Sequence, residues 1–150
     1  MTYGTQAFNP LTGHVVVVED DPVLGGLLRD IVEEAGAECA LYTTADDALV
    51  HLLTYSTPCA LLVTDYLLPG QLNGIELATL VGQKWPTVPM ILTTGYTLDH
   101  TPLPPRLFCL RKPWAIPQLM ASIEQVMADQ TALDVFSASS MQLVGTASPG

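Results

Sequence analysis

Short apolar runs alternate with amphipathic segments along most of this chain, and each kind of segment predicts a different element. The run HVVVV at residues 14–18 is β-branched and continuously apolar, which is typical of a strand covered on both faces. The segment at residues 21–36 has helical spacing, and its apolar stripe comprises Val23, Leu27, Leu28, Ile31 and Val32. Further strand patterns cover residues 37–43, 59–65, 88–94 and 106–112, and further helical patterns cover residues 44–56, 73–85 and 115–129. This alternation predicts an α/β domain with one parallel sheet and helices on both faces.

The two ends of the chain lack such periodicity. Residues 1–13 show no pattern, and residues 129–150 are rich in small residues. We therefore expect a flexible N-terminal arm, one folded domain over residues 14–128 and a flexible C-terminal tail. A chain of 150 residues has the usual size of one domain.

Composition excludes several classes of partner. The net charge is −10 and only five residues are Lys or Arg, which argues against nucleic-acid binding because phosphates require basic side chains. Neither a membrane span nor a signal peptide is evident in the pattern.

Three cysteines without metal-binding spacing are expected to be small buried thiols in a reducing cytoplasm: Cys39, Cys59 and Cys109. The histidines are scattered and are expected in surface or turn positions: His14, His51 and His100.

Polar residues follow four of the predicted strands. Glu19 and Asp20 come after the first strand, Asp65 ends the third, Thr94 ends the fourth, and Lys112 ends the fifth. Open parallel sheets place their sites beyond the carboxyl ends of the strands, so we expect these five residues to meet there. Polar residues at four separate strand ends indicate a functional site more strongly than any single short motif does.

The chemistry of this set points to phosphoryl transfer. Carboxylates from Glu19, Asp20 and Asp65 would repel one another by roughly 4 kcal/mol per pair at about 4 Å, so such a cluster favours raised pKa values or a bound cation. Oxygen ligands alone select Mg²⁺, or Mn²⁺, over zinc. A divalent ion, the lysine Lys112, the hydroxyl of Thr94 and an attacking carboxylate are the parts that phosphoryl transfer requires. The neighbouring acid Asp21 precedes Pro22 and a helical pattern, so we expect it to cap a helix.

Taken together, these residues resemble the receiver domain of a bacterial two-component response regulator. The resemblance rests on the acids of VVVVEDDP, the Asp of LLVTDYLLPGQLNG, the Thr of ILTTGY and the Lys-Pro of LRKPW, and it covers residues 14–128. It implies a five-stranded flavodoxin-like (βα)5 fold and a cytoplasmic signalling domain that is not an enzyme beyond its own phosphorylation and dephosphorylation. Asp65 would accept phosphate from the phosphohistidine of a histidine kinase or phosphotransfer protein.

The resemblance also assigns roles to the remaining residues. Glu19, Asp20 and Asp65 would hold Mg²⁺ with the backbone carbonyl of Leu67, while Thr94 and Lys112 would bind the phosphoryl group. Output would pass through contact with a downstream protein whose identity the sequence does not give.

Several positions depart from the family pattern and resemble the variant receivers attached to hybrid histidine kinases. The loop after Asp65 is one residue longer than the commonest form, and three prolines interrupt the segment between Thr94 and Lys112. The fourth helix is therefore expected to be short or missing, because proline removes helix donors. Where the family usually has an aromatic switch residue, this chain has Cys109. We therefore expect the loop at residues 95–105, with Tyr96 near its start, to carry the signal instead.

Other classes of function remain open. An interaction module that keeps the receiver fold without phosphorylation is the main alternative. A phosphatase or phosphotransferase with an aspartate nucleophile would usually have a carboxylate two residues after that nucleophile, and here that position is Leu67. A nucleotide-binding domain is disfavoured because the turn after the first strand is acidic and has no glycine-rich motif.

Overall fold

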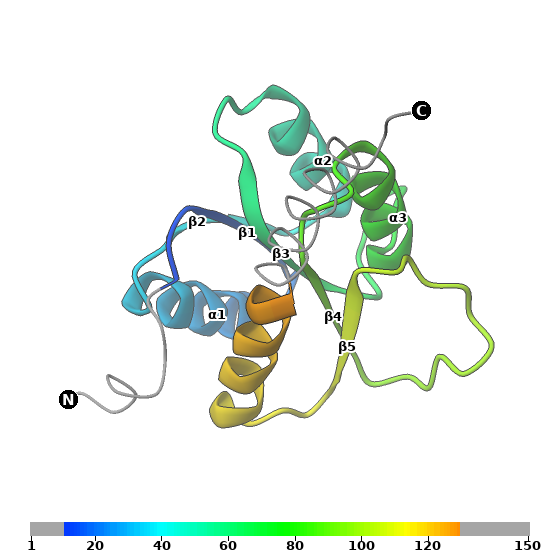
Figure 1. Cartoon of the computed structure of the whole chain (residues 1–150). Helices are drawn as coiled ribbons and strands as arrows, with labels where there is room; N and C mark the ends of the chain where they lie inside the picture. Colours follow the sequence, from blue (N-terminus) through cyan, green and yellow to red (C-terminus); the bar gives the residue numbers. More distant parts are fainter. Residues whose placement is uncertain (1–10, 130–150) are drawn as a thin grey trace, which may run out of the picture.

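The computed structural model describes residues 11–129, where a single sheet lies between two layers of helices (Figure 1). The strands are β1 (His14–Val18), β2 (Glu38–Tyr42), β3 (Cys59–Asp65), β4 (Met90–Thr94) and β5 (Leu107–Arg111). The helices are α1 (Pro22–Glu34), α2 (Ala45–Thr54), α3 (Gly74–Lys84) and a last helix over residues 116–129. Most of the expected N-terminal arm and C-terminal tail lies outside the described residues, so those two expectations stay predictions.

All strand pairs are parallel, and the strand order is β2-β1-β3-β4-β5. This is the flavodoxin-like order, so the predicted fold class is confirmed. The chain reverses its direction of strand addition between β2 and β3, which makes β1 and β3 direct neighbours in the middle of the sheet. The carboxyl ends of these two strands are consequently close together.

The core has two halves because successive side chains of a strand point to opposite faces of the sheet. Val15 and Val17 pack with α1 and the last helix, whereas Val16 and Val18 pack with α2 and α3. Every residue of β1 is buried, which explains why its sequence is apolar without alternation. The same distribution is visible in Figure 1, where α1 and the last helix lie on one side of the sheet and α2 and α3 on the other.

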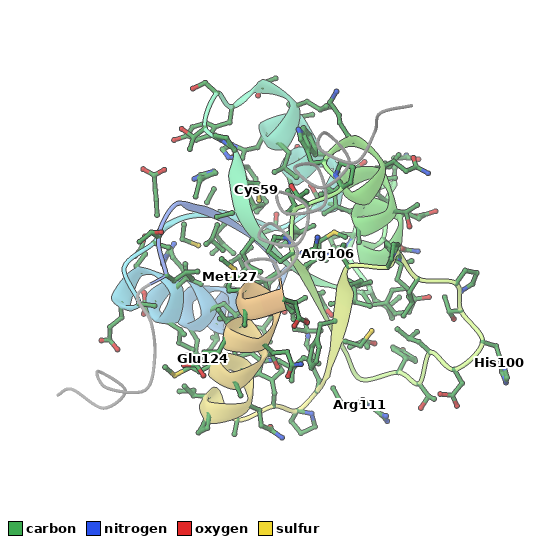
Figure 2. The ribbon with its side chains drawn as sticks, in the orientation of Figure 1. Cys59, His100, Arg106, Arg111, Glu124 and Met127 are labelled. Carbon is green, nitrogen blue, oxygen red and sulfur yellow. The ribbon has the colours of Figure 1, made fainter. Side chains whose placement is uncertain are left out.

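Residues 95–106, between β4 and β5, contain no helix. This confirms the expectation that the fourth helix is short or missing. The segment runs as an extended loop beside β5 (Figure 1), and its prolines at positions 102, 104 and 105 explain the absence of helical hydrogen bonds. His100 lies at the outer part of this loop (Figure 2).

Three expectations about burial are corrected by the structure. Val23 and Leu27 were expected in the buried stripe of the first helix, yet Val23 is 81% exposed and Leu27 38%. The face of α1 that meets the sheet is narrower and centres on Leu28 and Val32. Cys109 is exposed, because it lies on the edge strand β5 on the face that a fourth helix would have covered.

The third correction concerns His14, which is buried rather than on the surface. Its Nε2 lies 2.7 Å from Nε2 of His51, its Nδ1 lies 3.1 Å from Oε1 of Glu38, and the Nδ1 of His51 lies 2.8 Å from the hydroxyl of Tyr42. Since Glu38 can only accept, a consistent assignment has both imidazoles neutral, with each donor pointing along the chain from Tyr42 to Glu38. This network lies at the amino end of β1, away from the strand ends where the candidate site forms.

Across residues 11–129, no helix is long and apolar enough to cross a membrane.

Candidate functional site

The three acids expected to form one cluster do lie together at the carboxyl edge of the sheet. Glu19 directly follows β1, Asp65 is the last residue of β3, and the two strands are paired up to Val18 and Thr64. One carboxylate oxygen from each of Glu19, Asp20 and Asp65 can be chosen so that all lie within 4.8 Å of one another. Strand pairing therefore brings residues from positions 19 and 65 into one site.

Glu19 is the most deeply buried member of this cluster. It is only 2% exposed, its Oε2 accepts a hydrogen bond of 3.0 Å from the backbone N–H of Asp21, and its Oε1 lies 3.3 Å from Lys112 Nζ. Burial raises the pKa of Glu19, and the charge of Asp65 adds to the rise, while Asp21 N–H and Lys112 oppose it. A buried carboxylate under these opposing influences is well suited to bind a cation.

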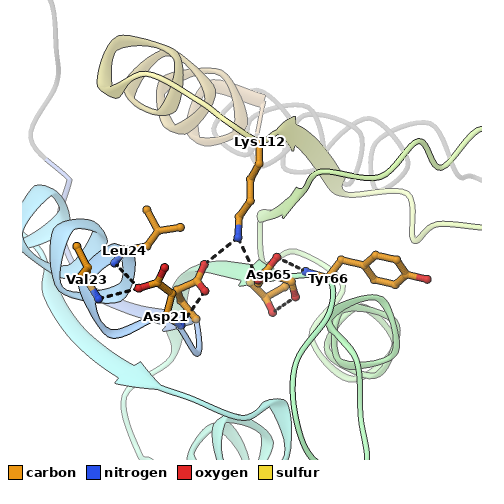
Figure 3. A network of polar contacts seen from close by, with 8 residues as sticks. Asp21, Val23, Leu24, Asp65, Tyr66 and Lys112 are labelled. Atoms are coloured by element: carbon orange, nitrogen blue, oxygen red, sulfur yellow. Dashed lines mark hydrogen bonds and ion pairs between the residues drawn. The ribbon is translucent and has the colours of Figure 1, made fainter.

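The side chain of Lys112 extends toward the same cluster from the end of β5 (Figure 3). It directly follows β5, and its Nζ lies 3.1 Å from Asp65 Oδ2 as well as 3.3 Å from Glu19 Oε1. Burial lowers the pKa of Lys112, but the hydrogen bond with Asp65 and the charges of Glu19 and Asp65 outweigh this effect and raise the pKa. The ammonium is thus a fixed positive charge at the candidate phosphoacceptor.

Asp65 is held on both sides of its carboxylate. Its Oδ2 faces Lys112, and its Oδ1 accepts a hydrogen bond of 2.8 Å from the backbone N–H of Tyr66 (Figure 3). The side chain keeps 12% exposure, so it is oriented by the protein but still open to solvent. Behind it, Gly74 at the start of α3 donates to Tyr66 O at 2.7 Å and leaves no room for a side chain against the Asp65 carbonyl.

Thr94 ends β4, the strand next to β3, and is buried. Its Oγ1 accepts a hydrogen bond of 3.0 Å from the backbone N–H of Tyr96, and that bond leaves the hydroxyl hydrogen available for donation. Its carbonyl accepts a hydrogen bond of 2.8 Å from the backbone N–H of Lys112, which connects the ends of β4 and β5.

Leu67 lies in the loop after Asp65 with a side chain 49% exposed, and the metal-binding role of its carbonyl stays a prediction.

Asp21 caps α1, as the sequence predicts. Its Oδ1 accepts from the backbone N–H groups of Val23 at 2.9 Å and Leu24 at 3.3 Å, and Pro22 is the first helical residue (Figure 3). This leaves Glu19 and Asp20 as the acids of the first strand end that contribute to the cluster of three.

A divalent cation fits this donor set. The three side chains offer only oxygen atoms, which Mg²⁺ and Mn²⁺ prefer, and neither histidine nor cysteine belongs to the group. A bound cation would also offset the burial and the smaller repulsion from Asp65 that raise the pKa of Glu19. The residues that the sequence predicts for a metal therefore have the chemistry and the proximity to hold one.

Two features of the site's surroundings were missed by sequence reasoning. Asp46, in the first turn of α2, accepts hydrogen bonds of 3.1 Å from the backbone N–H groups of Gln71 and Leu72 in the loop after Asp65. The rings of Tyr66 and Tyr96 contact each other edge to face. An acid in a first helical turn and two tyrosines near strand ends are common patterns, and their sequence alone does not indicate these long-range contacts.

Comparison with known proteins assigns the family. The family model of the response regulator receiver domain matches residues 15–103, which is more than half of the chain. The chain therefore belongs to the response regulator receiver domain family, which functions in two-component phosphorelay signalling and typically binds Mg²⁺ at an acidic pocket. The matched region includes Glu19, Asp20, Asp65 and Thr94 but ends before Lys112, whose place in the site comes from the structure.

Curated relatives resemble part of the chain. The nitrogen assimilation regulatory protein NtrX of Azorhizobium caulinodans is 27% identical over 82 residues, covering 55% of this chain and 18% of that protein. An uncharacterized 14.6 kDa protein from Leptolyngbya boryana is 38% identical over 88 residues, covering 57% of this chain and 65% of that protein. The chain thus spans less than two thirds of the length of either relative.

Solved receiver domains share the fold. A response regulator receiver domain from Clostridium thermocellum aligns with a TM-score of 0.70 at 17% identity, covering 81% of this chain and 98% of that one. A CheY-like receiver domain from Methanospirillum hungatei aligns with a TM-score of 0.69 at 21% identity, covering 81% of this chain and 98% of that one. NtrX from Brucella abortus aligns with a TM-score of 0.74 at 20% identity, covering 85% of this chain but 29% of that one.

Proposed function

We propose that this receiver domain accepts a phosphoryl group on Asp65 in a Mg²⁺-dependent reaction with a phosphohistidine. The observation that carries the proposal is the position of Asp65, whose carboxylate lies 3.1 Å from the Lys112 ammonium and forms one cluster with the acids Glu19 and Asp20. A nucleophilic carboxylate beside a fixed cation and a metal-binding group is the arrangement that phosphoryl transfer requires.

In the proposed reaction, an oxygen of Asp65 attacks phosphorus, and the phosphorus–nitrogen bond of the donor breaks with its electron pair remaining on the imidazole. Lys112 neutralises charge on the phosphoryl oxygens, and the hydroxyl of Thr94 donates its hydrogen to one of them. Glu19, Asp20 and Asp65, with the carbonyl of Leu67, would hold Mg²⁺, which when bound supplies further neutralisation of the phosphoryl oxygens.

The donor in this proposal is a sensor histidine kinase or a phosphotransfer protein. Val23 is 81% exposed in the first turn of α1, two residues after the cap residue Asp21, and it offers an apolar contact for a partner. The phosphorylated form would alter contacts with a downstream protein. We place this reaction in the cytoplasm, in keeping with three cysteines that are free thiols in the structure.

Incubation with acetyl phosphate and Mg²⁺, followed by intact mass, tests the proposal. We expect one stable adduct in the natural chain and none in Asp65→Asn, because the amide has nearly the same shape but is not nucleophilic. Circular dichroism of Asp65→Asn should show an unchanged fold.

Each other outcome overturns the proposal in a recognisable way. Continuous release of phosphate without an adduct would indicate a phosphatase, and no reaction would indicate an interaction module that keeps only the fold. An unchanged adduct in Asp65→Asn would place the phosphoacceptor elsewhere, with Asp20 the first residue to examine.

A further inference from the structure

Two tyrosines follow the two residues proposed to bind the phosphoryl group, and their rings contact each other. Tyr66 comes directly after Asp65, and Tyr96 lies two residues after Thr94. The ring centroids are 6.2 Å apart and the ring planes cross at 84°, which is the edge-to-face geometry that aromatic pairs prefer. The contact joins the loop after β3 to the loop after β4.

The backbone of each tyrosine also holds the side chain of the neighbouring site residue. Tyr66 N–H donates to Asp65 Oδ1 at 2.8 Å, and Tyr96 N–H donates to Thr94 Oγ1 at 3.0 Å. The four residues therefore form a continuous chain of contacts, in which two hydrogen bonds and one ring contact connect the carboxylate of Asp65 to the hydroxyl of Thr94. A displacement of the Thr94 hydroxyl must disturb the Tyr96 amide.

The segment that begins at Gly95 is able to respond to such a disturbance. Residues 95–106 contain no helix, and a methyl group added at Gly95 would meet no atom within 4 Å. Tyr96 is 58% exposed, so the protein covers less than half of its surface. Cys109 on β5 is small and exposed, and it offers no large side chain to transmit the same movement.

We propose that the Tyr66–Tyr96 ring pair positions the Thr94 hydroxyl in the unphosphorylated protein and transmits its movement to residues 95–106. When Thr94 turns to bond a phosphoryl oxygen, the Tyr96 amide loses its acceptor, the ring pair separates, and the exposed Tyr96 presents a changed surface to a downstream protein. Tyr66 and Tyr96 are positioning residues in this scheme. The inference rests on the proposed phosphorylation of Asp65.

Beryllofluoride with Mg²⁺, a mimic of the bound phosphoryl group, tests this in the full chain. Binding affinity is measured for the natural protein, Tyr66→Leu, Tyr96→Leu and the double variant, with Tyr55→Leu as a control that removes an exposed ring at the far end of α2. Since the ring pair stabilises the unbound arrangement, each single variant should bind about two- to tenfold more tightly, the range expected for loss of one aromatic pair. The double variant should equal the single variants, and Tyr55→Leu should match the natural protein.

Amide exchange on the same variants locates the change. In the natural protein, beryllofluoride should alter protection at residues 94–106, and this alteration should disappear beyond residue 96 in Tyr66→Leu while the change at Thr94 remains. Tyr66 lies in the loop after β3, whereas the protection change is measured in the loop after β4. If Tyr66 only packed locally, its substitution would not remove that change.

Strictly additive effects of the two substitutions, or unchanged affinity in both, would overturn the inference. So would protection changes confined to the surroundings of Cys109 and the last helix. If the natural protein binds beryllofluoride with these other patterns, only the ring-pair inference fails. If the natural protein neither binds beryllofluoride nor forms an adduct with acetyl phosphate, the proposed function fails and the inference fails with it.

Discussion

Lys112 Nζ lies 3.1 Å from Asp65 Oδ2, although 47 residues separate the two along the chain. The same ammonium lies 3.3 Å from Glu19, 93 residues away. One cation thus joins the ends of the first, third and fifth strands. The positive charge that a phosphoryl group would need is therefore already in position, which would reduce the reorganisation required in the proposed transfer.

Mg²⁺ should separate the roles of two adjacent acids. We expect Mg²⁺ to raise the melting temperature of the natural chain, because it binds the folded cluster of Glu19, Asp20 and Asp65. Asp20→Ala should weaken Mg²⁺ binding strongly without loss of helix stability. Asp21→Ala should instead lower the free energy of unfolding by about 1 kcal/mol, since it removes the cap of α1.

Calorimetric titration with Mg²⁺ and urea unfolding of both variants check this prediction. Equal loss of Mg²⁺ affinity in the two variants would show that the capping and metal-binding roles are wrongly divided.

Gly74 should tolerate no side chain, whereas Gly82 in the same helix should. A Cβ at position 74 would collide with the backbone carbonyl of Asp65, including its carbon at 2.8 Å, so Gly74→Ala must displace either α3 or Asp65. We expect a cost of about 3 kcal/mol or more in unfolding free energy, together with weaker Mg²⁺ binding. Gly82→Ala meets its nearest atom at 3.5 Å and should stabilise by about 0.5–1 kcal/mol, because alanine favours helix.

Urea unfolding of the two alanine variants gives the comparison directly. A stable Gly74→Ala protein with normal Mg²⁺ affinity would contradict the close packing of α3 against Asp65.

Asp46 should restrain the loop that follows Asp65. Its carboxylate accepts from Gln71 and Leu72 N–H groups at 3.1 Å, and hydrogen bonds to charged groups contribute about 1.5–3 kcal/mol when well formed. Because Gln71 is exposed, we expect Asp46→Ala to cost about 1–2 kcal/mol and to speed amide exchange at both residues. Asp47→Ala is the matched control, since it removes an acid from the same first helical turn.

Amide exchange and urea unfolding distinguish the two variants. Similar exchange at residues 71 and 72 in both would mean that the loop holds its position without Asp46.

His51 should make stability depend on pH. Burial, with a smaller contribution from His14, lowers the pKa of His51 below the usual 6.5. The unfolded chain then binds a proton more readily than the folded chain, so stability is present above about pH 6.5 and is lost as pH falls below that value. The geometry agrees, because two imidazoles with Nε2 atoms 2.7 Å apart need one acceptor and cannot both be fully protonated.

Unfolding free energies between pH 5 and pH 7.5 check this for the natural chain and for His51→Gln, in which the dependence should become shallower. His100→Gln, in the exposed loop after β4, should keep the natural dependence. An identical pH profile in all three proteins would exclude the histidine pair as its source.

Local sequence determined the strands, the helices and the residues at the strand ends. The unbroken valines of β1 indicate a strand buried on both faces, and Asp21-Pro22 indicates a capped helix, because these signals depend only on neighbouring residues. The prolines after Thr94 also predicted the missing helix. Parallel strands carry their carboxyl ends to one edge, so the presence of Glu19, Asp65 and Lys112 at that edge followed from the pattern.

Only the tertiary structure decided which side chains meet and which remain exposed. The pairing of His14 with His51, the contact of Tyr66 with Tyr96 and the attachment of the loop to Asp46 each join separate elements through side-chain orientation, which periodicity does not specify. Exposure of Cys109 likewise depends on the absence of a covering helix at an edge strand. These features arise from how the elements pack against one another, and no short stretch of sequence contains that information.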